Sequence, residues 1–143
     1  MFADEQIFGW YYSLCTGLDR LLFHQETLEF TAPEFDWPVW QFKPTESSIL
    51  FTYYLKKEDM KKCHKYVFVN YPIDRKEFAT QAISACHRLL KDLLSLSQSA
   101  KKEIQDKESD GWRYLQALKE IEDKLNYYPF GKDDLDKLLA QAG

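Results

Sequence analysis

The side chains best suited to chemistry, three cysteines and three histidines, have no recognised ligand or catalytic spacing. The chain contains no His-Glu-x-x-His, no Cys-x-x-Cys and no compact acidic calcium loop around His24, His64 or His87. Cys63 and His64 are adjacent, but neighbouring residues of a strand point to opposite faces, so they cannot form an activated thiol pair. We therefore expect no metal site and no cofactor.

Cys15, Cys86 and His87 fall within helical patterns of apolar residues. The two cysteines are expected to be buried small hydrophobic residues. His87 is expected at the edge of a buried stripe, as a partly exposed structural residue, because a general base needs a partner within hydrogen-bond reach. Glycine-rich phosphate loops and Gly-x-Ser-x-Gly are also missing from the sequence, so we expect a protein that is not an enzyme.

Residues 29–41, called here the acidic–aromatic segment, are the most distinctive candidate for binding. Acidic side chains alternate there with large rings, and one further acidic residue follows. The candidate partner-binding residues are Glu29, Glu34, Phe35, Asp36, Trp37, Trp40 and Glu46. One interpretation is an edge strand with its rings in the core and its acids in water. The other is a docking surface, on which rings anchor a basic partner and acids steer its approach.

Charge and composition restrict the classes of function. The net charge is -4, and residues 1–60 contain ten acidic against four basic side chains, whereas residues 61–92 contain seven basic against three acidic ones. This balance disfavours a generally basic nucleic-acid binder. An odd number of cysteines, an acidic N-terminus and the lack of a long apolar run favour a cytoplasmic protein without membrane contact.

The 143 residues fit one domain, 1–143, of the α+β class. The pattern predicts an N-terminal helix over residues 3–23 and a small antiparallel sheet. The four strands are expected at residues 27–31, 39–43, 48–55 and 64–71. A long helix then begins at Asp74, where Glu77 completes a capping box, and residues 97–108 continue it as an exposed extension. A break at 109–111 precedes further helices to Leu125 and over 133–142, packed on one sheet face.

This layout resembles small bacterial immunity proteins of contact-dependent growth inhibition and related polymorphic toxin systems. The resemblance spans residues 8–94. It is carried by Trp10, Leu18, Leu21 and Leu22 in the first helix, by Pro33, Trp37, Pro38 and Trp40 in the strand region, and by Pro72 and Phe78 at the long helix. It implies a cytosolic inhibitor that binds one cognate toxin domain, often a nuclease, and occludes its active or functional surface. The acidic front half fits a basic nuclease, while the basic middle departs from that pattern.

Two other classes stay open. The long helix could extend its apolar stripe into a dimer interface and serve a secretion chaperone or adaptor. An enzyme with an unrecognised small site is the third class. Whether the chain is a monomer or a homodimer is left open by the sequence.

Overall fold

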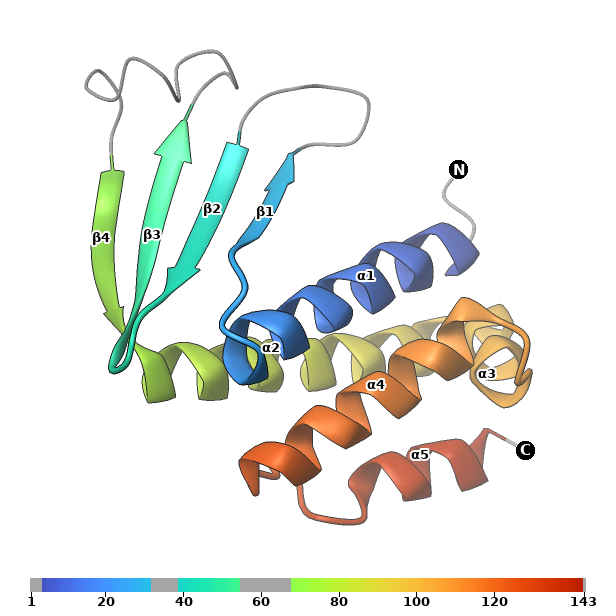
Figure 1. The fold of residues 1–143 in the computed structure, drawn as a ribbon. Helices are drawn as coiled ribbons and strands as arrows, with labels where there is room; N and C mark the ends of the chain where they lie inside the picture. The colour runs from blue at the N-terminus through green and yellow to red at the C-terminus, as the bar shows by residue number, and fades with distance from the viewer. Residues whose placement is uncertain (1–3, 32–38, 55–67, 143) are drawn as a thin grey trace. The chain divides into compact units, whose positions relative to one another are not determined.

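The structure, a computed structural model, describes residues 4–31, 39–54 and 68–142 (Figure 1). The chain is α+β: one helix precedes a four-stranded antiparallel sheet and the other helices follow it, as the sequence predicts. Its residues divide into two compact units, unit 1 (1–16 and 80–143) and unit 2 (17–79). A single domain over 1–143, with helices packed on one sheet face, stays a prediction.

The elements lie close to their predicted positions, with exceptions at the fourth strand and after the long helix. They are α1 (Asp4–Phe23), β1 (Leu28–Thr31), β2 (Val39–Pro44), β3 (Ser48–Tyr54), β4 (Phe68–Asp74), α2 (Arg75–Leu96), α3 (Gln98–Gln105), α4 (Asp110–Leu125) and α5 (Asp134–Gln141). Among the described residues, no helix combines the length and the apolar character needed to cross a membrane.

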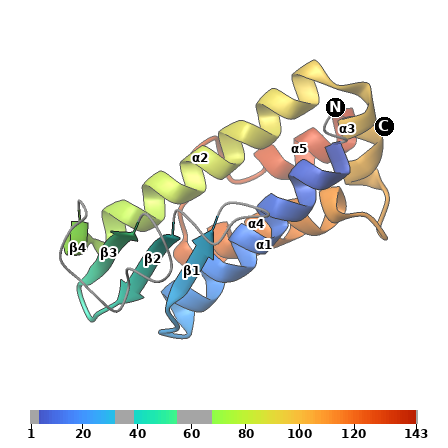
Figure 2. The same cartoon turned by 90° about the horizontal axis from the view of Figure 1, so that it is seen from above.

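The sheet of unit 2 is antiparallel, as predicted, and its strands lie in the order β1-β2-β3-β4 (Figure 1). Phe42 pairs with Phe51 across β2 and β3, and their ring centroids lie 5.0 Å apart. The ring of Phe78, in the first turns of α2, lies 5.2 Å from Phe42. Aromatic side chains on one sheet face therefore anchor the start of α2, which follows directly from β4 (Figure 2).

The fourth strand lies further along the chain than predicted. It was expected at 64–71, but β4 runs from Phe68 to Asp74, and residues 64–67 lie outside the described part. The observed strand includes Pro72, which cannot donate a hydrogen bond to a ladder. Pro72 pairs with Leu50 on an edge strand, where its missing N–H is tolerated.

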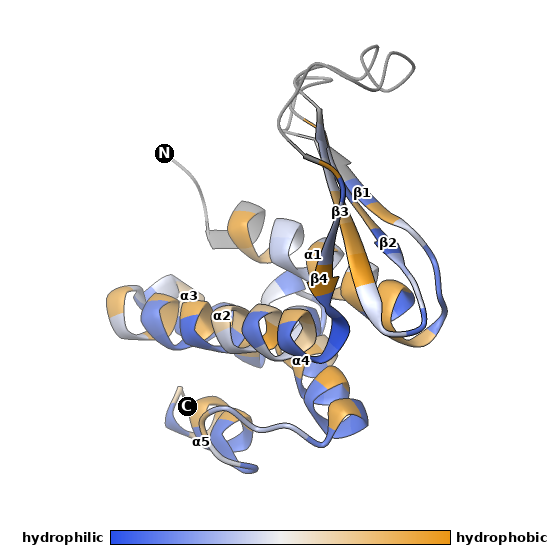
Figure 3. Cartoon of the chain, turned by 90° about the vertical axis from the view of Figure 1, so that its left-hand side faces the viewer, coloured by the Kyte–Doolittle hydropathy of each residue, from blue (hydrophilic) through white to orange (hydrophobic). Residues whose placement is uncertain are grey.

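Residues 97–108 are not the predicted exposed extension of the long helix. A new helix, α3, begins there, and the Ser97 hydroxyl accepts a hydrogen bond from the Ala100 N–H. Ile104 is fully buried. A break before the next helix is confirmed, but it ends at Ser109, because α4 already begins at Asp110. Ser109 caps α4 by accepting a hydrogen bond from the Trp112 N–H. Polar and apolar residues alternate around α4 and α5, as in amphipathic helices (Figure 3).

The core of unit 1 forms around Tyr114 of α4, which is fully buried. Its hydroxyl donates a 2.6 Å hydrogen bond to the backbone carbonyl of Cys86 on α2. The centroid of its ring lies 6.0 Å from the ring centroid of Phe8 and 5.9 Å from that of Tyr11, both on α1. Cys15 and Cys86 are buried, as the sequence predicts. Within unit 1, aromatic and sulfur-containing side chains thus join α1, α2 and α4.

Candidate functional site

A buried histidine held between two carboxylates is the most unusual polar arrangement of unit 1. His87 on α2 is fully buried. Its Nδ1 lies 2.6 Å from Oε2 of Glu122 on α4, and its Nε2 lies 2.6 Å from Oδ2 of Asp134 on α5. Lys91, one turn further along α2, reaches the same Asp134 carboxylate at 3.2 and 3.3 Å. We call these four residues the His87 cluster.

The sequence-based prediction of the exposure of His87 was wrong. The side chain was expected to be partly exposed, but it is fully buried and has two partners within hydrogen-bond reach. An imidazole that meets a carboxylate at each nitrogen satisfies both of them only when it carries two protons. The cluster then holds two positive and two negative charges, which leaves it neutral as a whole.

The local electrostatics favour this doubly protonated ring. Burial by itself favours the neutral form of His87, but the hydrogen bonds and charges of Glu122 and Asp134 outweigh burial and raise its pKa above the ordinary 6.5. Burial likewise opposes ionisation of Asp134, yet hydrogen bonds from His87 and Lys91 lower its pKa below 3.8. Both shifts stabilise the charged cluster at neutral pH.

Phe130, in the turn between α4 and α5, adds an aromatic face to the cluster. Its ring centroid lies 4.7 Å from that of His87 and 4.8 Å from the Lys91 Nζ. The Arg88 guanidinium carbon lies 5.5 Å from the same ring. A ring that faces cations is attracted to them through its quadrupole. Phe130 therefore stabilises the positive side of the cluster without adding a charge.

The cluster is arranged for stability rather than for proton transfer. A general base must present a free nitrogen to a substrate, whereas both ring nitrogens of His87 are occupied and the ring has no exposed surface. In the part of the chain that the structure describes, no group of three or more His, Cys, Asp or Glu side chains could hold a metal ion. The cluster instead joins three helices, α2, α4 and α5.

The thiol of Cys15 is a poor nucleophile, and that of Cys86, whose pKa is lowered by its contacts with Cys15 and Tyr114, is kept from solvent by burial. The neighbouring Cys86 thiol, together with burial, raises the pKa of the Cys15 thiol well above its ordinary value. A reactive cysteine needs thiolate character and access to solvent. Cys15 has neither, which agrees with its predicted role as a core residue.

The described members of the predicted binding set lie in three different settings of unit 2. Glu29 is exposed on the edge strand β1, and its carboxylate accepts a 3.1 Å hydrogen bond from Gln41. Glu46 is exposed between β2 and β3, while Trp40 is half-buried on β2 with its ring 6.1 Å from Tyr53. The predicted residues Glu34, Phe35, Asp36 and Trp37 lie outside the described part of the chain.

The sheet register separates two of these residues. Glu29 pairs with Gln41, so it shares the sheet face of Gln41. Trp40 is the chain neighbour of Gln41, and successive side chains of a strand point to opposite faces. Glu29 and Trp40 therefore do not form one continuous surface. Of the described candidates, the exposed acids rather than the ring are available to a partner.

Sequence reasoning missed Glu122 and Asp134 as partners of His87. Glu122 was recognisable from its spacing, because it follows Leu115 and Leu118 at the interval of the buried stripe of α4. A carboxylate at such a position must find a cation or a donor inside the protein. Which cation it finds depends on the packing of α2 against α4, and no local pattern encodes that packing.

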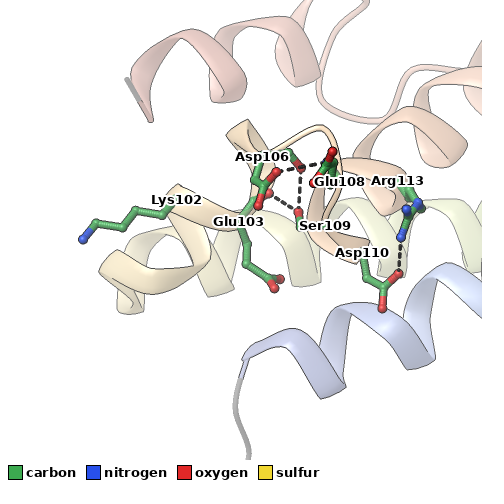
Figure 4. A pocket seen from close by; sticks show the side chains of 7 residues that line it. All are labelled: Lys102, Glu103, Asp106, Glu108, Ser109, Asp110 and Arg113. Atoms are coloured by element: carbon green, nitrogen blue, oxygen red, sulfur yellow. Dashed lines mark hydrogen bonds and ion pairs between the residues drawn. The ribbon is translucent and has the colours of Figure 1, made fainter.

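A second polar feature of unit 1 is an open pocket of about 450 Å³ where α3 meets α4 (Figure 4). Its lining is polar, with every residue but Ser109 charged, and consists of Lys102, Glu103, Asp106, Glu108, Ser109, Asp110 and Arg113. Ser109 donates to the backbone carbonyls of Glu103 and Asp106, and Arg113 pairs with Asp110 at 3.1 Å. These bonds connect the end of α3 to the start of α4.

No family model, curated protein or solved structure matches this chain.

Proposed function

We propose that this chain is a non-catalytic inhibitor of the immunity type, which binds a cognate toxin domain with a basic surface, such as a nuclease, and occludes it. The observation that carries the proposal is the exposure of two carboxylates of unit 2, Glu29 on the edge strand β1 and Glu46 beside β2. Together with Glu34 and Asp36, the other two acids of the acidic–aromatic segment, they supply negative charge for a basic partner.

Electrostatics support this role. Exposed charges of one sign steer the approach of an oppositely charged protein and fix its orientation. Nucleases are basic where they hold phosphate, so an acidic surface complements them. The hydrogen bond from Gln41 orients the Glu29 carboxylate before binding, which reduces the side-chain entropy lost on association.

A non-catalytic role also agrees with the state of the best acid–base candidate. His87 has both nitrogens engaged and no exposed surface, so the cluster stabilises unit 1 instead of meeting a substrate. The resemblance in layout to immunity proteins points the same way.

The alternative, a secretion chaperone or adaptor, relied on an apolar stripe of the long helix that a second copy would cover. Ile83, Leu90 and Leu94 of that stripe are already buried within the single chain. We therefore favour the inhibitor. A dimer in size-exclusion chromatography that dissociates on substitution of α2 would favour the chaperone.

The direct test is co-expression with the product of the neighbouring gene. The proposal expects this protein to rescue growth from that product and to co-purify with it. Failure of both rescue and co-purification would remove the immunity hypothesis.

Charge reversal then tests the surface. We expect Glu29→Lys with Glu46→Lys to weaken binding by about tenfold or more, because like charges placed across an interface cost several kcal/mol. Lys43→Glu, on the sheet face of Glu29, should strengthen binding, and Asp92→Lys on α2 is the control. Equal effects of the Asp92 and Glu29/Glu46 substitutions would place the docking surface elsewhere.

A further inference from the structure

We propose that His87 is a charge-dependent latch that holds α5 on the other helices of unit 1, so that loss of the ring proton releases α5 while the packing of α1, α2 and α4 persists. The inference is independent of the proposed function. It rests on the geometry of the His87 cluster and on the weakness of the other contacts that α5 makes with the described residues.

The His87 cluster needs the ring to be charged. A neutral imidazole has one N–H donor and one lone pair, yet both of its nitrogens lie 2.6 Å from a carboxylate oxygen. Glu122 is almost completely buried and cannot turn to water, so it retains the single N–H. The lone pair of Nε2 then opposes the oxygen of Asp134, and the two groups repel each other.

Asp134 is the member of the cluster that can move. Its side chain is 16% exposed, against 2% for Glu122, so rotation brings its carboxylate into water. The groups that face the ring are Glu122 from α4, Asp134 from α5, and Lys91 with Arg88 from α2 around Phe130. When the ring is neutral, only Lys91 among these cations still binds Asp134.

The rest of α5 is weakly attached. Leu135 is buried, but the Lys119–Asp136 pair is exposed and the bond from Gln105 to the Leu139 carbonyl is 3.5 Å long. The N-cap residue, Asp133, makes no side-chain capping bond. A helix of eight residues is far below the roughly 12–15 that an isolated helix needs in water. Once Asp134 leaves the ring, the segment therefore unfolds instead of remaining helical.

The test is hydrogen exchange of the full chain over a pH series, corrected for the intrinsic pH dependence of amide exchange, with the His87 ring followed by NMR. We expect protection of α5, for example at the Lys137 N–H, to fall as His87 titrates while protection of α4 stays constant. The equilibrium constant for release of α5 changes by about tenfold for each unit by which the pKa of His87 differs between the latched and the released state.

Two matched variants on α5 sharpen the result. Asp134→Asn should lower α5 protection by about tenfold or more and remove its pH dependence, because it removes the charged partner of the ring. Asp136→Asn, which removes only the exposed pair with Lys119, should change protection by less than about threefold.

The wild-type series alone decides the question if a variant fails to fold. Simultaneous loss of protection in α4 and α5 would overturn the proposal, since the opening would then be global. Constant α5 protection through the titration, or a ring that stays charged to about pH 10, would overturn it as well.

Discussion

His87 and Glu122 are 35 residues apart in the chain, both lie in the core, and the Nδ1 of one is 2.6 Å from a carboxylate oxygen of the other. A buried carboxylate is stable only when a cation or several donors compensate for its lost hydration. Glu122 occupies a position in α4 that the helical pattern reserves for apolar residues. The charge of Glu122 is therefore balanced by His87. Each of the two residues compensates for the cost of burying the other.

Removing one member of this pair should be strongly destabilising. We expect Glu122→Leu to lower the free energy of unfolding by about 3–5 kcal/mol, because it leaves a buried imidazolium without its main partner. Glu120→Leu is the matched control on the same helix. Its side chain is 67% exposed and pairs with Lys124 one turn away, so we expect about 0.5 kcal/mol or less. Urea unfolding followed by circular dichroism measures both, and equal losses would contradict the pairing.

Removing both charges should be milder than removing one. In His87→Leu/Glu122→Leu no uncompensated charge stays buried, and Asp134 keeps Lys91 as a partner. We expect the double variant to be more stable than Glu122→Leu alone. A double variant whose loss equals the sum of the two single losses would mean that His87 and Glu122 do not interact.

The His87 cluster also predicts how stability depends on pH. The pKa of His87 is raised by folding, so its contribution is fully present below 6.5, its ordinary pKa, and is lost as pH rises through the folded pKa. The pKa of Asp134 is lowered, so its contribution is present above 3.8 and is lost as pH falls through its folded pKa. Between pH 3.8 and pH 6.5, His87 and Asp134 both contribute fully to the stability of the folded protein.

The measurement is a series of urea titrations of the wild type and of His87→Gln from about pH 4 to about pH 10. We expect the stability difference between the two proteins to be largest in the acidic window and to shrink as pH rises. A difference that stays constant, or grows, above neutral pH would mean that folding does not raise the pKa of His87.

The parts of the fold that depend on local sequence patterns, such as apolar spacing and helix caps, were predictable from the sequence. Apolar spacing located α1, α2 and α4, and Asp74 and Ser109 marked the starts of two helices, where each accepts a hydrogen bond from a backbone N–H three residues later. The exceptions have identifiable causes. Pro72 belongs to a strand because that strand lies at the sheet edge, and Ser97 begins a new helix because its hydroxyl caps α3.

The His87 cluster was beyond the reach of sequence patterns for a different reason. Each of its members looks ordinary in its own segment, and only the packing of three helices brings them together. His87 seemed to lie at the edge of a stripe because its neighbour Cys86 fills the stripe position. The carboxylates that contact its ring belong to Glu122 and Asp134, which lie 35 and 47 residues further along the chain. Sequence patterns that relate neighbouring residues cannot predict contacts over such separations.

Within unit 2, Gly17 of α1 packs closely against Leu28 of β1 because glycine has no side chain. A Cβ at this position would overlap Cδ1 of Leu28, the first residue of β1. Overpacking of this kind costs about 1–3 kcal/mol, and removing a helical glycine returns about 1 kcal/mol. We expect Gly17→Ala to lower the free energy of unfolding by about 1 kcal/mol.

The control for Gly17 is a double-variant cycle with Leu28→Ala, measured by urea unfolding. Shortening Leu28 removes the overlap, so Gly17→Ala should become neutral or stabilising in that background. The same loss in both backgrounds would show that Leu28 is not the cause.

Arg75 joins the end of α1 to the turn between β2 and β3. Its guanidinium donates to the Leu22 carbonyl at 2.5 Å, to the Thr45 carbonyl at 2.7 Å and to the Gln25 side chain at 3.3 Å. Leu22 lies in the last turn of its helix, where carbonyls lack helical partners. The planar guanidinium satisfies this orphan group and the turn at the same time.

We expect Arg75→Ala to lower the free energy of unfolding by about 2 kcal/mol, because hydrogen bonds from a charged donor contribute more than neutral ones. Arg75→Lys should recover only part of this loss, since an ammonium on a flexible stem cannot reproduce the fork that spans two carbonyls. Lys76→Ala, at the exposed neighbouring position, should change stability by about 0.5 kcal/mol or less. Full recovery by lysine in urea unfolding would mean that charge, and not the geometry of the guanidinium, stabilises this junction.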